Sequence, residues 1–136
     1  MSVLVDTDVW SEILRKVKGE FSPQAKTLIA LIDKAEVGVT IIGAIRQEVL
    51  SGWRERQQFE RIRDLLRDFP DREVGRGEYE LAAEYFNTCR SKGIQGSSTD
   101  LLICACSAAW NMPILTKDRD YALYAQHIPV RVYGPS

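Results

Sequence analysis

The sequence has little of several residue types that would mark particular classes of protein. Its 136 residues include a single histidine, His127, and three cysteines, an odd number without the spacing of a zinc finger. Cys104 and Cys106 stand two positions apart in an apolar run, so we expect both to be small core residues. Free cysteines of this kind are typical of a protein in a reducing cytoplasm. We expect His127 at the surface and not as a metal ligand.

An excess of charge of one sign and long apolar runs are also missing. Lysine and arginine number 18 and aspartate and glutamate 19, a net charge of −1, so any contact with nucleic acid must come from local patches. No apolar run approaches the roughly 20 residues of a membrane span. Asp6 interrupts the first apolar run, which argues against a signal peptide. With 45% hydrophobic and 27% charged residues, the composition predicts one soluble globular domain over residues 1–136.

Short apolar stretches alternate with longer amphipathic ones along the chain. The segment LLICACSAAW at 101–110 is apolar nearly all round, which predicts a central, buried helix. The alternation predicts an α/β protein, a three-layer α/β/α domain with a short, mainly parallel central sheet. Strands are expected at 3–5, 37–41, 72–75, 113–116 and 129–133, and helices at 7–18, 24–36, 43–52, 55–68, 78–92 and 101–110.

Carboxylates stand at the ends of the expected strands. Asp6 closes the first strand, and Asp118 and Asp120 follow the strand that ends in PILT. Asp100 opens the central helix, which leads directly into that strand and therefore begins at the same edge of the sheet. Glu48 lies on a helix whose other residues are mostly apolar. Because ligands bind at the carboxyl edge of parallel sheets, we expect these acids to converge on one site.

Helix capping explains any one of these aspartates as well as chemistry does, because Asp is a preferred N-cap. It explains the set less well. The stretches DTD and DRD each carry two acids where a cap needs one, and no acid or base stands four residues from Glu48 to form a pair within its helix. A cluster of carboxylates suits Mg²⁺ or Mn²⁺. Whether Asp8 caps a helix or belongs to the site stays open at this stage.

Four segments together resemble the PIN-domain family, and in particular the VapC-type toxin ribonucleases of type II toxin–antitoxin pairs. VLVDTDVWSE resembles the family's opening strand and first acid, Asp6. IRQEVLSGWRERQQFERIRDLL carries the acid Glu48, and RSKGIQGSSTDLLICACSAAW carries Asp100. PILTKDRDY resembles the closing motif. The resemblance covers nearly the whole chain.

The resemblance implies a metal-dependent ribonuclease that forms a homodimer and binds a small antitoxin protein. It implies catalytic roles for Asp6, Glu48, Asp100, Asp118 and Asp120, of which Asp6, Asp100 and Asp118 ligate Mg²⁺ or Mn²⁺, with Thr116 and Ser98 as their hydrogen-bond partners and Lys117 and Arg119 as RNA contacts. The arginines between positions 54 and 63 are interspersed with acids, so we expect a solvated helix face there. Apolar surface for a dimer is expected on the 55–69 helix and at Trp10, Ile13 and Leu14.

Two other functions remain open on the sequence alone. A phosphotransferase of the haloacid-dehalogenase type also begins with a strand ending in D-x-D, which would make Asp6 the nucleophile and Asp8 the acid. That reading leaves Glu48 and Asp100 without a role, and a trapped aspartyl-phosphate would decide for it. A PIN-like module that only binds a partner would not need the acids, and a divalent ion would then not raise its melting temperature.

Overall fold

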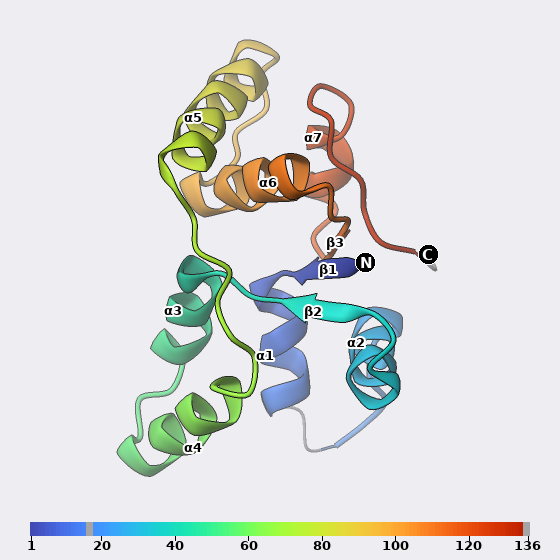
Figure 1. Cartoon of the computed structure of the whole chain (residues 1–136), viewed down its shortest axis with the longest axis vertical. Coiled ribbons are helices and arrows are strands. Elements are labelled where there is room, and N and C mark those ends of the chain that lie inside the picture. The colour runs from blue at the N-terminus through green and yellow to red at the C-terminus, as the bar shows by residue number, and fades with distance from the viewer. Residues whose placement is uncertain (16–17, 135–136) are drawn as a thin grey trace.

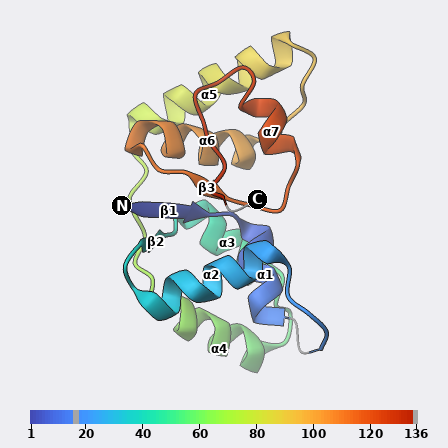
Figure 2. The same cartoon turned by 90° about the vertical axis from the view of Figure 1, so that its right-hand side faces the viewer.

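A three-stranded parallel sheet forms the middle layer of the computed structural model, which describes residues 1–15 and 18–134. The strands are β1 (Ser2–Val5), β2 (Gly38–Thr40) and β3 (Ile114–Leu115), in the order β2-β1-β3. Helices cover both faces of the sheet, α1 to α4 on one side and α5 to α7 on the other (Figures 1 and 2). The predicted α/β/α architecture is confirmed. The helices are α1 (Thr7–Arg15), α2 (Pro23–Lys34), α3 (Gly43–Ser51), α4 (Arg56–Leu66), α5 (Arg76–Ser91), α6 (Ser98–Trp110) and α7 (Asp120–Tyr124).

The central strand β1 sets the register of the sheet. Its Leu4 lies opposite Thr40 of β2 and Ile114 of β3, and both pairings are parallel. Side chains of a central parallel strand are covered on both faces, and Val3, Leu4 and Val5 are all 0% exposed. The pairing with β3 continues one residue past β1, where the Asp6 amide donates to the Leu115 carbonyl at 2.9 Å. The ends of β1 and β3 therefore meet at one edge.

Two predicted strands, 72–75 and 129–133, are wrong. Only single bridges form near them, between Ile41 and Asp71 and between Ile114 and Val132. A strand needs a partner of matching length, and β2 and β3 are three and two residues long. The predicted helix at 7–18 is observed from Thr7 to Arg15, and its positions 16 and 17 lie outside the described residues.

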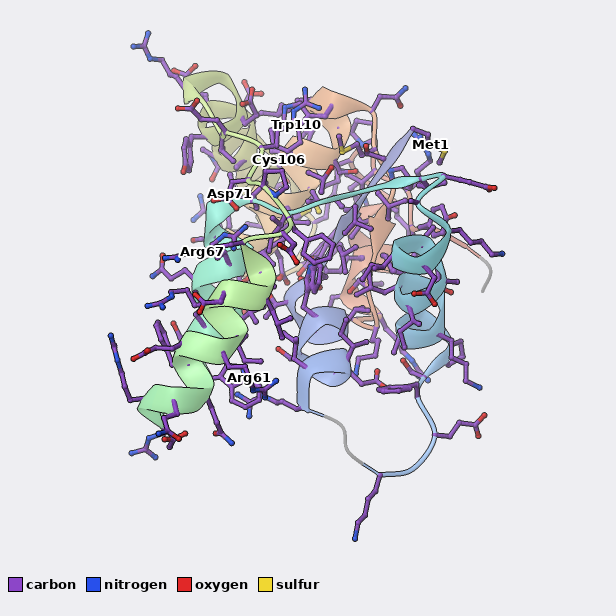
Figure 3. The ribbon with its side chains drawn as sticks, turned by 60° about the horizontal axis from the view of Figure 1, so that its bottom comes forward. Met1, Arg61, Arg67, Asp71, Cys106 and Trp110 are labelled. Atoms are coloured by element: carbon purple, nitrogen blue, oxygen red, sulfur yellow. The ribbon has the colours of Figure 1, made fainter. Side chains whose placement is uncertain are left out.

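The core is built around α6, as its apolar sequence predicts. Every residue from 101 to 107 is buried, and Cys104 and Cys106 are free and 0% exposed, so their predicted place in the core is confirmed. Figure 3 labels Cys106 and Trp110 on this helix. Packing with α5 covers its outer side. No helix in the described ranges is both long and apolar enough to cross a membrane.

The expectation that Trp10 belongs to an exposed apolar stripe is wrong. Trp10 is 1% exposed and packs edge-on against Phe69, with ring centroids 5.0 Å apart. Ile13 and Leu14 on the same helix are half-buried against the core. This stripe therefore joins α1 to the segment after α4 within one molecule and offers little surface to a second.

Candidate active site

Asp6 is the most buried acid at the carboxyl edge of the sheet, with 7% of its surface exposed. Its Oδ1 accepts a hydrogen bond from the Thr7 amide at 2.8 Å, and its Oδ2 accepts one from the Thr116 hydroxyl at 2.8 Å. Its carbonyl oxygen accepts from the amides of Val9 and Trp10 and so starts α1. The strand end and the helix start thus fix this carboxylate in place.

The pKa of Asp6 is raised from 3.8 to about 7. Burial is the largest cause, and the negative charges of Asp8 and Asp100 add to it. The hydrogen bonds from Thr116 and Thr7 work in the opposite direction and are too weak to compensate. The chain thus holds several carboxylates together at the cost of mutual repulsion.

Thr116 and Asp118 link the end of β3 to the start of α7. The Thr116 hydroxyl, which is buried, accepts from the Asp118 amide at 3.0 Å while it donates to Asp6. Asp118 Oδ1 in turn accepts from the Asp120 amide at 2.9 Å, a hydrogen bond of the Asx-turn type two residues along the chain. Asp118 therefore stabilises the turn that leads into α7.

Asp8 points across to the segment after β3. Its Oδ2 accepts from the Lys117 amide at 3.1 Å. Burial raises the pKa of Asp8, the contacts with Lys117 lower it, and the charge of Asp118 raises it further. Asp8 thus ties the loop that carries Asp118 to the start of α1 instead of capping its own helix.

Asp100 lies half-buried in the first turn of α6 and is not the cap of that helix. Ser97 is the N-cap, since its hydroxyl accepts from the Asp100 amide at 3.0 Å. The Asp100 carboxylate instead accepts from two phenols of α7, Tyr124 at 2.8 Å and Tyr121 at 3.4 Å. Ser98, the predicted partner of the acids, is exposed, and within residues 1–15 and 18–134 no hydrogen bond joins it to one of them.

The remaining predicted residues lie around this group. Glu48 is exposed on α3, and its Oε1 accepts from the Thr7 hydroxyl at 2.6 Å, which connects it to the residue beside Asp6. Asp120 and Arg119 are exposed at the start of α7. Lys117, predicted to contact RNA, has its ammonium 3.1 Å from Oε1 of Glu12. An RNA phosphate must compete with that carboxylate for Lys117.

The donor set fits a hard divalent cation in its chemistry. All the ligands on offer are carboxylate oxygens, which Mg²⁺ and Mn²⁺ prefer, and the repulsion at Asp6 is what such a charge offsets. As the side chains stand, no group of three or more His, Cys, Asp or Glu residues in the described ranges is arranged around one ion point. The oxygens of Asp6 and Asp100 accept hydrogen bonds from the Thr7 amide, from Thr116 and from the α7 tyrosines, and each carboxylate oxygen keeps a second lone pair that can face an ion.

Three residues that contact the acids were not predicted from the sequence: Thr7, Tyr121 and Tyr124. Tyr121 and Tyr124 stand three positions apart, one turn of helix, directly after the DRD motif. That spacing indicates a shared face and could have pointed to them. Thr7 carries no such signal, because Thr beside an acid is common at helix starts.

Comparison with known proteins identifies the family to which this fold belongs. The family model described as the PIN domain matches residues 3–126, which include all five predicted catalytic acids. The chain belongs to the PIN domain family. The resemblance inferred from the sequence is thus confirmed, and the haloacid-dehalogenase alternative loses its support. No curated protein sequence matches the chain significantly.

Three solved structures that are similar to this PIN domain share less than 20% of their sequence with it. VapBC2 from Rickettsia felis, bound to a DNA fragment from their promoter, gives a TM-score of 0.78 at 14% identity over 98% of both chains. VapBC-1 from nontypeable Haemophilus influenzae gives a TM-score of 0.73 at 14% identity over 98% of this chain and 97% of the other. FitAcB from Neisseria gonorrhoeae gives a TM-score of 0.72 at 18% identity over 99% of this chain and 98% of the other. At these identities the likeness is one of fold.

Proposed function

We propose that this PIN domain is a divalent-metal-dependent ribonuclease, the toxin of a toxin–antitoxin pair. The observation that carries the proposal is the buried Asp6 carboxylate, whose pKa is raised to about 7 by burial and by the charges of Asp8 and Asp100. Perturbed acids of this kind cluster at functional sites. A protein that only binds a partner has no need of such repulsion.

Asp6, Asp100 and Asp118 are the residues that would hold Mg²⁺ or Mn²⁺, with Glu48 and Asp120 acting through bound water. The ion, when bound, supplies an activated water and neutralises charge on the phosphate under attack. Thr116 keeps Asp6 oriented and, through the Asp118 amide, sets where Asp118 begins its turn. Arg119, exposed beside Asp118, supplies positive charge for the RNA backbone.

An antitoxin partner and a homodimer complete the proposal. The similar solved structures include a member of the VapBC family of toxin–antitoxin systems, VapBC-5 from Mycobacterium tuberculosis, which supports a small protein partner for this chain. An antitoxin that covers the acids would keep the nuclease silent in the cytoplasm. Light scattering at micromolar concentration tests the dimer, and a strict monomer would contradict that part alone.

Cleavage of total RNA by the purified protein tests the enzyme. We expect cutting with Mg²⁺ or Mn²⁺ and none after a chelator is added, and we expect Asp6→Asn to be inactive. Asp68→Asn is the matched control, because Asp68 is an exposed acid just after α4, outside the group described above. Intact RNA after incubation with wild type and metal would leave a binding module as the better description.

A further inference from the structure

Both oxygens of Asp100 face hydroxyl groups from one short helix, α7. Oδ2 accepts from Tyr124 at 2.8 Å and Oδ1 accepts from Tyr121 at 3.4 Å. The two tyrosines are 0% exposed, and their rings meet edge-on with centroids 5.3 Å apart. Two fully buried phenols therefore converge on a half-buried carboxylate from the side of the core.

Nothing else described on α6 explains how the Asp100 side chain is oriented. Ser97 caps the helix through the Asp100 amide, so the carboxylate is not used for capping. The carboxylate lies near Asp6, whose negative charge repels it. A phenol is neutral near pH 7, and its hydroxyl donates a hydrogen bond to a carboxylate. Tyr124 and Tyr121 therefore offset this repulsion and hold both oxygens of Asp100 in one orientation.

Gly96 leaves room for the Tyr124 hydroxyl beside the chain that enters α6. A Cβ at position 96 would lie 2.8 Å from the Tyr124 Oη and 3.1 Å from its Cε1, and it would also meet Leu101 Cδ2. The chain before α6 thus passes directly against the phenol. A larger residue at 96 would require Leu101 and the Tyr124 ring to shift.

We propose that Tyr124 is a positioning residue, which holds Asp100 ready to ligate the divalent ion, with Tyr121 in a lesser role. The inference rests on the proposed function, because it assumes that Asp100 is a ligand. It makes α7 a link between two acids. Asp118 accepts from the Asp120 amide at its start, and Tyr124 reaches from its end to Asp100.

Calorimetric titration of the metal-free protein with Mn²⁺ tests the proposal without relying on activity. Removing the partner of a metal ligand commonly weakens metal binding by about 10- to 100-fold, so we expect Tyr124→Phe to raise the Kd for Mn²⁺ by about 10-fold or more. Tyr121→Phe should have a smaller effect, because its contact is longer. Tyr133→Phe is the matched control. Tyr133 lies near α2 and should leave the Kd unchanged.

The dependence of RNA cleavage on Mn²⁺ separates positioning from a general loss of structure. For Tyr124→Phe we expect the half-saturating Mn²⁺ concentration to rise with the Kd while the maximal rate returns close to that of wild type. A purely structural role would lower the fraction of binding-competent protein and leave the Kd alone. Gly96→Ala, which keeps the phenol but crowds it together with Leu101, should also raise the Kd and serves if Tyr124→Phe folds poorly.

The outcomes distinguish the two proposals. A wild-type protein that binds no Mn²⁺ would overturn the proposed function and this inference with it. A wild type that binds Mn²⁺, beside a folded Tyr124→Phe with the same Kd, would overturn the positioning role alone.

Discussion

The hydroxyl of Thr116 donates a hydrogen bond to Oδ2 of Asp6 at 2.8 Å, across 110 positions of sequence. The contact closes the carboxyl edge of the sheet, because Thr116 directly follows β3 and Asp6 directly follows β1. The same hydroxyl accepts from the Asp118 amide, so a single buried oxygen serves two of the proposed metal ligands.

Replacing Thr116 by Val should destabilise the metal-free protein. Valine keeps the shape but leaves the Asp118 amide and Asp6 Oδ2 without their partner, and a buried polar group left unpaired costs about 1–3 kcal/mol. Urea unfolding in the presence of chelator measures the change. Thr116→Ser keeps the hydroxyl and should lose much less, and equal stability for Val and Thr would show that the contact contributes nothing.

The stability of the metal-free protein should fall as the pH rises, because of Asp6. Its pKa is about 7 in the folded state against an ordinary value of 3.8, so folding favours the protonated form. The resulting penalty is absent below about pH 4, grows between pH 4 and 7, and is complete above pH 7, where it reaches at most about 4 kcal/mol.

Comparison with Asp6→Asn isolates the site from the rest of the chain, because groups far from Asp6 titrate alike in both proteins. The free energy of unfolding of the Asn variant minus that of wild type should increase from pH 4 to pH 8 in chelator. Asparagine can still accept from the Thr7 amide and can donate to Thr116, so the contacts at the site are kept. A difference that stays flat with pH would show that Asp6 is an ordinary solvated acid.

Substitutions of Asp118 should affect the stability of the metal-free protein and the binding of metal differently. Asp118→Asn keeps an oxygen to accept from the Asp120 amide, whereas Asp118→Ala loses that contact and about 0.5–2 kcal/mol. Both changes delete the charge, so both should abolish most of the rise in melting temperature that Mn²⁺ gives wild type. An Asn variant with the full rise would assign Asp118 to the turn alone.

Arg119 should contribute to RNA binding through its charge. Arg119→Gln should weaken binding of single-stranded RNA by the metal-free protein, and the slope of log K against log salt should fall by about 0.7. Arg56→Gln is the control, because Arg56 pairs with Glu60 at 2.7 Å on the outer face of α4. Figure 3 labels Arg61 of α4 and Arg67 just after it, and both are exposed. An equal loss of RNA affinity in the two variants would indicate that any positive charge on the surface attracts RNA nonspecifically.

The sequence predicts the architecture well because each layer has its own periodicity. Short apolar runs alternate with amphipathic ones, and the all-apolar segment at 101–110 could only be a central helix. The expected face of arginines on α4 is confirmed, since Arg56 and Arg63 pair with Glu60 and Asp64. The acids were placed at the strand ends by parallel topology alone.

The features that were missed depend on contacts between distant segments. The segment 129–133 has the composition of a strand, but only one of its residues finds a partner on the two-residue β3. An apolar residue such as Trp10 suits both an exposed dimer surface and a core position. Only its contact with Phe69, which is distant in the sequence, shows that it is buried. The contact of Tyr124 with Asp100 likewise depends on how α7 docks against α6, which the local sequence does not encode.

If the protein cuts RNA as proposed, the cap of α6 has a practical consequence for isolating that RNA. Because Ser97 caps the helix, Asp100 can be exchanged for Asn without removing the cap, and Asn can still accept from a tyrosine. A cell should therefore tolerate such a folded but silent protein without its antitoxin. Purified gently, the protein would carry its uncut target, and sequencing that RNA would identify a substrate that cleavage normally destroys.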